Sequence, residues 1–358
     1  MAPTGEDGSV TTKILPPSDK VDWPNLAFKA NPVNGHVQTV YKNGAWGELE
    51  FVEEPFLRVS VMAPALNYGQ QCFEGLKAFR CKDGHIRIFR PDENAKRMRH
   101  SGEMVAMPAV PEDLFIEAAK LATAKNIEFV PPYELGQALY LRPLLLGTGP
   151  QLALLPPDEF TFIVACTPVA NLYSASGAKP IDAIIVEDFD RAAPAGTGSA
   201  KLGGNYAPVF QHAAKAKAAG FPITLHLDSK TRSHVDEFST SNFLALKGSG
   251  SETTLVVPES TSILKSVTTK SVIELAKSFG WKVERRPVPV EEISEFSEIM
   301  SAGTAAVISP IKSVTYRGQK LVQLSEECGP GSQKILRTLR AIQTGDAEDT
   351  FGWNVLVM

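Results

Sequence analysis

The sequence predicts a mixed α/β fold built from two domains. Its 358 residues exceed the roughly 250–300 that a single hydrophobic core usually serves. Short apolar segments typical of strands are interspersed with helical segments, without the strict alternation of a doubly wound sheet. A stretch rich in Asn, Ser, Gly and Pro near the middle is typical of a linker. We therefore expect a flexible N-terminal arm (1–24), a small α/β domain (25–168), an interdomain loop (169–180) and a large C-terminal domain (181–358).

Apolar runs and turn signals predict the elements of the first domain. Pro91 suits the first turn of a helix, and Lys82-Asp83-Gly84 suits the turn of a hairpin. The expected strands are 51–62, 72–80, 85–89, 139–146 and 160–168, and the expected helices are 91–104 and 112–126.

The same signals predict the elements of the second domain. Gly220 and Gly280 are typical of the residue that ends a helix. The expected strands are 181–186, 223–227, and the paired segments 242–246 and 254–257, and the expected helices are 206–219, 268–279 and 332–343.

Composition excludes several classes of function. A hydrophobic content of 43% with 21% charged residues is typical of a soluble globular protein, and the net charge of −4 gives no reason to expect a nucleic-acid partner. No apolar run approaches the ~20 residues that cross a bilayer, and the first 18 residues hold neither a signal-like core nor an arginine. The four cysteines form no CxxC pair, so we expect reduced thiols, no metal site and a cytoplasmic location.

The segment from Gly198 to Pro208 points to chemistry. It places Lys201 among small residues, just ahead of the pair Gly203-Gly204. A lysine amine held away from water becomes a usable nucleophile, and it can form a Schiff base with a carbonyl such as the aldehyde of pyridoxal phosphate. Because most lysines are solvated surface charges, the spacing alone does not decide between the two readings.

A lysine that carries pyridoxal phosphate needs partners for the ring. Glu237 is the candidate acid that keeps the pyridine nitrogen protonated, although it could also be a surface acid beside Asp236. Tyr206, five residues after Lys201, is the candidate donor to the phenolate oxygen, although a buried tyrosine often only packs.

The phosphate needs partners as well. Phosphate groups bind helix N-termini and guanidinium groups. The segments 266–269 and 303–306 are small-residue stretches of this kind, and Arg97 is a candidate for the charge. Each could equally be an ordinary helix cap or a surface base.

Six segments, in this order and at these separations, together carry a family resemblance. They are Phe73-Glu74-Gly75-Leu76-Lys77-Ala78-Phe79; Phe89-Arg90-Pro91 with Asn94 and Arg97-Met98; Tyr140-Leu141-Arg142-Pro143; Lys201-Leu202-Gly203-Gly204-Asn205-Tyr206; Glu237 with Thr240 and Asn242-Phe243; and Gly303-Thr304-Ala305. Over roughly residues 25–355 the chain resembles the branched-chain amino acid aminotransferases. These are class IV pyridoxal phosphate-dependent aminotransferases of fold type IV, with two mixed α/β domains.

The resemblance implies a role for each matching residue. Lys201 is implied to be the Schiff-base lysine and proton shuttle, Glu237 the partner of the pyridine nitrogen, and Tyr206 the partner of the phenolate. The implied phosphate site is Arg97, Val267, Thr268 and Thr304. The implied substrate-binding residues are Tyr68, Phe73, Tyr140, Arg142 and Ala305. The resemblance also implies a homodimer.

The chain departs from the family pattern in three respects. Many eukaryotic members carry a CxxC where this chain has Ala306 and Ser309, so no thiol redox switch is expected. Ser239 stands where a glycine is usual, next to the cofactor plane. Val33 stands where the family often has phenylalanine, which would enlarge the side-chain pocket.

The resemblance implies a branched-chain-amino-acid transaminase, and hence a part in branched-chain amino acid biosynthesis. It would transfer an amino group between a branched-chain or related hydrophobic L-amino acid and 2-oxoglutarate by a ping-pong mechanism. Alternatives of the same fold are an aminotransferase of a specialised secondary-metabolite pathway, a D-amino acid or amine transaminase, and an aminodeoxychorismate lyase. An alternative of another class is a non-catalytic paralogue that binds a metabolite or a protein.

Overall fold

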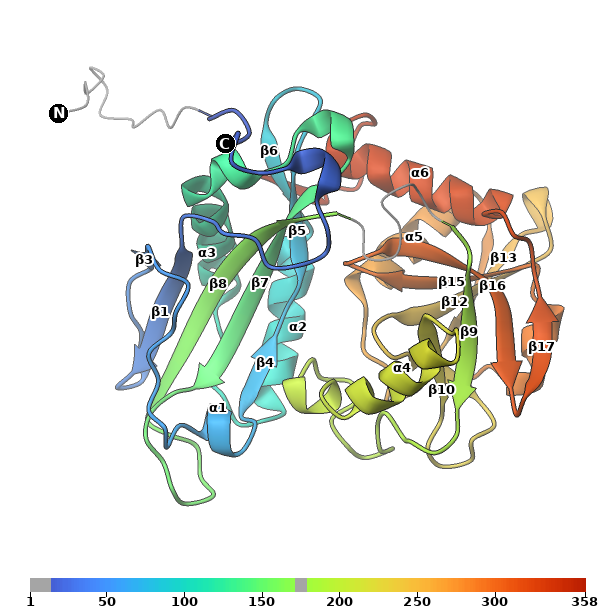
Figure 1. Cartoon of the computed structure of the whole chain (residues 1–358), viewed down its shortest axis with the longest axis horizontal. Coiled ribbons are helices and arrows are strands. Elements are labelled where there is room, and N and C mark those ends of the chain that lie inside the picture. The colour runs from blue at the N-terminus through green and yellow to red at the C-terminus, as the bar shows by residue number, and fades with distance from the viewer. Residues whose placement is uncertain (1–13, 171–178) are drawn as a thin grey trace.

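The computed structural model describes residues 14–170 and 179–358, which form two β-sheets that lie next to each other with helices packed around them (Figure 1). The first 13 residues of the expected arm and most of the expected interdomain loop lie outside the described residues. None of the described helices is long and apolar enough to span a membrane.

The first sheet is antiparallel throughout and has the order β18-β6-β5-β7-β8-β1-β2, with β3 paired to β1 and β4 paired to β7. Its strands are β1 (His36–Lys42), β2 (Ala45–Trp46), β3 (Glu50–Val52), β4 (Gln71–Phe73), β5 (Leu76–Arg80), β6 (Ile86–Phe89), β7 (Ala138–Gly147), β8 (Glu159–Val169) and β18 (Asn354–Leu356).

Two helices cover this sheet, and a short one precedes β4. They are α1 (Pro64–Asn67), α2 (Pro91–Glu103) and α3 (Glu112–Lys125), and the single turns are η1 (Trp23–Asn25), η2 (Ile127–Phe129) and η3 (Tyr133–Leu135). Pro91 begins α2 as expected, since its missing N–H is not needed there. Phe115 of α3 stacks on Phe162 of β8 with 5.7 Å between ring centroids, and both are fully buried.

The second sheet mixes parallel and antiparallel pairs in the order β11-β10-β9-β16-β15-β12-β13-β14, with β17 paired to β16. An additional pairing of Glu237 with Asn242 joins β11 to β12, so six of these strands close on themselves. The strands are β9 (Ile181–Val186), β10 (Ile223–Leu227), β11 (Val235–Phe238), β12 (Asn242–Lys247), β13 (Thr254–Pro258), β14 (Lys282–Arg286), β15 (Glu298–Gly303), β16 (Val307–Tyr316) and β17 (Gln319–Gln323).

Three helices and three single turns complete the second half. They are α4 (Val209–Ala218), α5 (Val267–Ser278), α6 (Pro330–Thr344), η4 (Gly203–Asn205), η5 (Gly250–Glu252) and η6 (Val290–Glu295). Helices α5 and α6 pack on each other and on β15, and buried Leu275, Ile335 and Leu339 belong to one core cluster there. The segment after α6 returns to the first sheet, where β18 pairs with β6.

The expected elements are largely present, with three differences. The prediction of strands over 51–62 is wrong after β3, because Glu53, Glu54 and Pro55 interrupt the pattern and Val61 is 81% exposed. The helix expected from residue 206 begins later, at Val209. Strands β1, β2, β11, β14 to β17 and β18 were not anticipated.

Candidate active site

Lys201 lies where the two sheets meet. Its backbone N–H donates to Ser101 Oγ of α2 at 2.8 Å, and its carbonyl accepts from the Phe73 N–H of β4 at 3.0 Å. A β-bridge also joins Leu202 to Cys72. The loop between β9 and α4 is therefore fastened to the first sheet on both sides of Lys201. This holds the lysine at the junction of the two halves.

The loop around Lys201 is shaped by its own sequence. The Asn205 amide donates to the carbonyls of Thr197 and Ala200 at 2.8 and 3.0 Å, and it accepts from Thr197 Oγ1 at 2.9 Å. A Cβ atom at Gly203 would collide with the side chain of Gln71. The loop thus packs closely against β4 at Gly203, and a larger residue there would displace the end of the Gln71 side chain.

The Lys201 amine faces two aromatic rings. Its Nζ donates to Tyr206 Oη at 3.0 Å and lies 4.4 Å from the centroid of the Phe73 ring. The Phe73 and Tyr206 rings meet edge to face at 5.0 Å. The amine thus has a phenol beside it in place of a carboxylate partner, which suits a group that must leave its resting contact to react.

Glu237 is a buried carboxylate, with 2% of its surface exposed, and not the surface acid that the sequence left open. Oε1 pairs with Arg191 at 2.6 Å and accepts the Leu264 N–H at 3.0 Å, while Oε2 accepts from Asn242 Nδ2 at 2.9 Å. Burial raises the pKa of Glu237 to about 7, although Arg191 opposes that shift. Since a carboxylate offers about four acceptor sites, one site remains at Oε2.

Arg191 joins the acid to the phenol. The guanidinium that pairs with Glu237 also lies close to Tyr206, with 5.7 Å between its carbon and the centroid of the Tyr206 ring. Lys201, Tyr206, Arg191 and Glu237 thus form one continuous chain of contacts. No sequence signal had singled out Arg191.

Arg97 is held in one orientation by a second buried acid. Its Nε and Nη2 donate to the two carboxylate oxygens of the fully buried Glu74, each at 2.7 Å. Its Nη1 donates to the Lys265 carbonyl at 3.1 Å, just before the start of α5. Because a guanidinium carries five N–H groups, two remain for an anion at this helix terminus.

The expected phosphate residues come together at that terminus. Ser266 caps α5 by accepting the Thr269 N–H at 3.1 Å. Val267 and Thr268 from α5 share a small cavity with Thr304 from the turn after β15. The free N–H groups of the first helical turn and the Arg97 guanidinium are together typical of a phosphate site.

The turn after β15 is tied to the first sheet by a buried lysine. Lys77 Nζ of β5 donates to the Ala305 carbonyl at 2.8 Å, and burial lowers the pKa of Lys77 to about 7. Val307, just after the turn, has a φ of +64°, which is strained for a β-branched residue. Backbone strain of this kind is often found at functional sites, which agrees with the predicted role of this turn.

Arg142, which was predicted to bind substrate, lies next to two aromatic rings. Its guanidinium carbon lies 5.0 Å from the Phe73 ring and 5.3 Å from the Tyr140 ring, and Nη2 reaches the Tyr140 hydroxyl at 3.4 Å. Among the described residues Arg142 has no carboxylate partner, and its buried Nε has no hydrogen bond. A guanidinium without a counter-ion beside a cavity is suited to bind a carboxylate of the substrate.

The hydroxyl of Tyr68 forms its hydrogen bond outside this cluster. Tyr68 follows α1, is 46% exposed, and its hydroxyl donates to the Leu152 carbonyl at 2.5 Å. The other predicted residues, Phe73 included, take part in the contacts and the small cavity described above.

The residues that sequence reasoning left without a role are Glu74, Lys77, Asn242 and Arg191. The first three stand inside the segments that carry the resemblance, so their positions were visible but their contacts were not.

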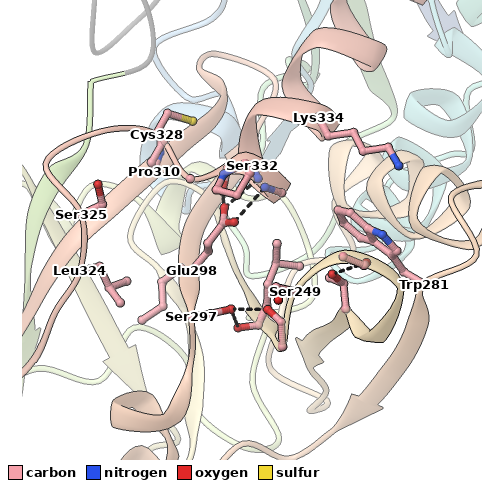
Figure 2. Close-up of a pocket in the computed structure, with 18 of the residues that line it drawn as sticks. Ser249, Trp281, Ser297, Glu298, Pro310, Leu324, Ser325, Cys328, Ser332 and Lys334 are labelled. Atoms are coloured by element: carbon pink, nitrogen blue, oxygen red, sulfur yellow. Dashed lines mark hydrogen bonds between the residues drawn. The ribbon is translucent and has the colours of Figure 1, made fainter.

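Figure 2 shows a different cavity, of about 660 Å³, beside the N-terminus of α6. Its carboxylate, Glu298, accepts the N–H groups of Gly331 and Ser332 at 2.8 Å each and the Ser332 hydroxyl at 2.6 Å. Lys334 Nζ lies 4.1 Å from the centroid of the Phe279 ring. These polar groups serve the fold of this region, and none of the predicted site residues lines the cavity.

Comparison with known proteins decides the family. Residues 71–314 match the family model for amino-transferase class IV. The chain is a class IV aminotransferase. It is 48% identical over 351 residues to aminotransferase poxL of Penicillium oxalicum, covering 96% of this chain and 95% of that protein. It is 43% identical to branched-chain amino acid aminotransferase gloG of Glarea lozoyensis, covering 96% and 98%.

Solved structures agree with this class IV fold. The branched-chain amino acid aminotransferase of Escherichia coli superposes with a TM-score of 0.75 at 27% identity, over 90% of this chain and 100% of that one. Class IV aminotransferases use pyridoxal 5′-phosphate. The site fits that cofactor, because among residues 14–170 and 179–358 Lys201 has no carboxylate partner, Glu237 keeps a free acceptor site, and Arg97 keeps two N–H groups at the start of α5. Among the described residues, no group of His, Cys, Asp and Glu side chains could hold a metal ion.

Proposed function

We propose that this aminotransferase transfers the amino group of a branched-chain or related hydrophobic L-amino acid to 2-oxoglutarate in two half-reactions that share one pocket. The observation that carries the proposal is the position of Arg142, a guanidinium without a carboxylate partner between the apolar Phe73 ring and Tyr140. The aromatic surface suits an aliphatic chain, and the guanidinium suits the second carboxylate of glutamate.

The residues of the chain divide the work of the reaction. When bound, the cofactor stores the amino group and spreads the electrons left at Cα as its proton leaves. Lys201 Nζ takes the proton from Cα and returns it to the neighbouring carbon. Between these two transfers the Lys201 amine donates a hydrogen bond to Tyr206 Oη. Glu237, buried and oriented by Arg191 and Asn242, holds the proton at the ring nitrogen. Arg97 and the first turn of α5 anchor the phosphate.

Lys201→Ala tests this proposal. The variant should lose transamination of L-leucine with 2-oxoglutarate by several orders of magnitude, because the proton carrier at Cα is removed. It should also lose the visible absorbance of lysine-bound cofactor. Lys270→Ala, at an exposed lysine of α5, is the matched control and should keep both. Turnover of the Lys201 variant near the wild-type rate would refute the assignment.

A donor panel tests the substrate class. We expect L-leucine, L-isoleucine and other hydrophobic L-amino acids to react with 2-oxoglutarate, and their D-enantiomers to be inert. A preference for D-amino acids or simple amines would instead favour the sibling enzymes of this fold.

We further propose a homodimer and a cytoplasmic location. An exposed apolar face, formed by 61–68 and 152–155, supports the homodimer. It includes Val61, Leu66, Leu152, Leu154 and Leu155, each more than 60% exposed. The backbone bond from Gln151 to Met62 and the Tyr68 bond to Leu152 hold the two segments together. Apolar surface gathered in this way is typical of a protein interface. The four free cysteines support a location in a reducing compartment.

A further inference from the structure

Glu74 is a fully buried acid that takes no part in the proton transfers described above. Its two carboxylate oxygens accept four hydrogen bonds. Arg97 Nε and Nη2 donate one to each oxygen at 2.7 Å, and Oε2 also accepts from Asn94 Nδ2 at 2.7 Å and from the Gly75 N–H at 3.1 Å. Since a carboxylate offers about four acceptor sites, Glu74 has none left for a cofactor or a substrate.

These bonds fix the plane of the Arg97 guanidinium. The group is planar, and two parallel bonds hold its Nε and Nη2 edge, so the directions of its remaining N–H groups are fixed as well. Nη1 donates to the carbonyl of Lys265, two residues before the start of α5, at 3.1 Å. The N–H groups that stay free are therefore held beside the first turn of α5, where an anion is favoured.

The same acid belongs to the segment of backbone that holds Lys201. Its neighbour Phe73 donates an N–H to the Lys201 carbonyl at 3.0 Å, and the Phe73 ring lies 4.4 Å from Lys201 Nζ. The N–H of Glu74 itself donates to the Pro143 carbonyl of β7 at 2.9 Å. One short stretch of the first sheet thus connects the guanidinium of the phosphate site with the reactive lysine.

We propose that Glu74 is a positioning residue, which directs Arg97 to the cofactor phosphate at a set separation from Lys201. Through Arg97 it makes the enzyme distinguish phosphorylated from unphosphorylated forms of the cofactor. The proposal holds whichever amino acid is the substrate, so it does not depend on the proposed branched-chain transamination.

Two effects of Glu74 oppose each other. Its negative charge repels a phosphate, so charge alone predicts tighter phosphate binding in Glu74→Gln. Orientation predicts weaker binding, because glutamine has a single acceptor oxygen and turns an amide NH₂ towards the N–H groups of Arg97. Orientation is the larger effect here, since the Glu74 charge is already balanced by the guanidinium within a pair whose side chains are 0% and 9% exposed.

The experiment measures binding of pyridoxamine 5′-phosphate and of pyridoxamine to the full-length enzyme freed of cofactor. The two amines differ only in the phosphate, and neither condenses with a lysine. Isothermal titration calorimetry gives both dissociation constants, the weaker one by competition, and their ratio isolates the contribution of the phosphate. We expect Glu74→Gln to lower the preference for the phosphorylated amine at least tenfold, the effect of losing one charged hydrogen bond. Binding of pyridoxamine should change less than threefold.

Further variants show whether Glu74 acts through Arg97. Arg97→Lys retains the charge without the planar fork and should lower the same preference at least tenfold. The double variant should lose at most threefold more than Arg97→Lys alone. Asn94→Ala removes one donor to Glu74 and leaves the ion pair, so it should lower the preference about threefold. This milder variant tests the proposal even where Glu74→Gln does not fold.

Glu93→Gln is the matched control. Glu93 is another acid next to α5, which it joins to α2 by pairing with Lys270 at 2.7 Å, and its replacement should leave the preference unchanged.

Three results would overturn the proposal. If Glu74→Gln or Asn94→Ala weakens both amines equally, or neither, the acid serves only the fold. If the preference for the phosphorylated amine rises in Glu74→Gln, charge outweighs orientation. If the losses in the double variant multiply, Glu74 acts on the phosphate independently of Arg97.

Discussion

Glu237 shows how a single residue depends on its neighbours. Arg191, Leu264 and Asn242 fix its two oxygens, and burial raises its pKa to about 7. Replacing it with glutamine retains the shape but not the ability to hold a proton at a pyridine nitrogen.

We expect Glu237→Gln to keep the cofactor bound and to slow removal of the Cα proton by at least tenfold, because the electron sink is weakened. A single-turnover half-reaction with L-leucine measures this rate directly. Asp236→Asn, which alters the neighbouring acid that bonds Ser260, should leave the rate unchanged. An unaltered rate in Glu237→Gln would remove the residue from this role.

His226 makes stability depend on pH. It is buried beside Ser239, whose hydroxyl lies 2.8 Å from its Nε2, and burial together with the Arg191 charge lowers its pKa to about 3. Between pH 6.5 and 3 the unfolded chain therefore binds a proton that the native ring does not. Above pH 6.5 this difference in proton binding vanishes. Below pH 6.5 the free energy of unfolding falls by ~1.4 kcal/mol per pH unit as the pH drops towards 3.

We expect His226→Gln, which retains a polar group near Ser239, to flatten the slope of unfolding free energy against pH in that window. Urea unfolding at several pH values measures the slope. His85→Gln, at an exposed histidine, provides the comparison and should reproduce the wild-type slope. Identical slopes for all three proteins would contradict the buried, neutral state of His226.

At this scale the sequence predicts residue types better than contacts. Lys201 and Tyr206 are five residues apart, so their meeting at 3.0 Å follows from a local turn. Glu237 could not be told from a surface acid, because its burial depends on β11 being enclosed by β10 and β12. Arg191 lies 46 residues before Glu237, and no local pattern relates the two.

The N-terminus of helix α6 is capped by a residue from another element. Gly329 at its N-cap has no side chain, and Glu298 of β15 supplies the carboxylate to the first N–H groups instead (Figure 2). The interaction joins the helix to the strand beneath it.

Glu298→Ala should therefore lower the free energy of unfolding by about 1–2 kcal/mol, through loss of a charged cap. Urea denaturation measures the change. Glu327→Ala, an acid that lines the same cavity, should shift stability by less than ~0.5 kcal/mol. Transaminase activity of both variants should be retained, since Glu298 lies outside the Lys201 site. A neutral Glu298→Ala would show that water caps α6 equally well.

The sequence located the elements that begin or end at a proline, a glycine or a turn motif. Pro91 starts α2, Gly280 follows α5, and Lys82-Asp83-Gly84 turns β5 into β6. Strands β14 to β17 carry mixed polar and apolar residues without a clean alternation. These segments form strands because they pair with neighbours in the second sheet. Their existence is therefore a tertiary effect that a local pattern does not reveal.

At the scale of the whole molecule, two sheets are joined through the site itself. Lys77 connects β5 to the turn after β15, and Lys201 is fastened to α2 and β4. The apolar face around Leu154 is not covered by any other part of the described chain.

If that face joins two copies, Leu154→Asp should convert the homodimer to monomers at micromolar concentration, because a charge would be buried at the interface. Sedimentation velocity gives the oligomeric state. Leu135→Asp, at an exposed leucine of η3, should leave it unchanged. A Leu154→Asp protein that remains dimeric would place the interface elsewhere.

The return of β18 to the first sheet limits how this protein can be divided. A gene cut between β8 and β9 would leave Asn354–Leu356 on the wrong fragment, and β6 would lose its outer neighbour. The two pieces would need each other to mature, as in fragment complementation, and neither would be expected to survive alone as an autonomous module.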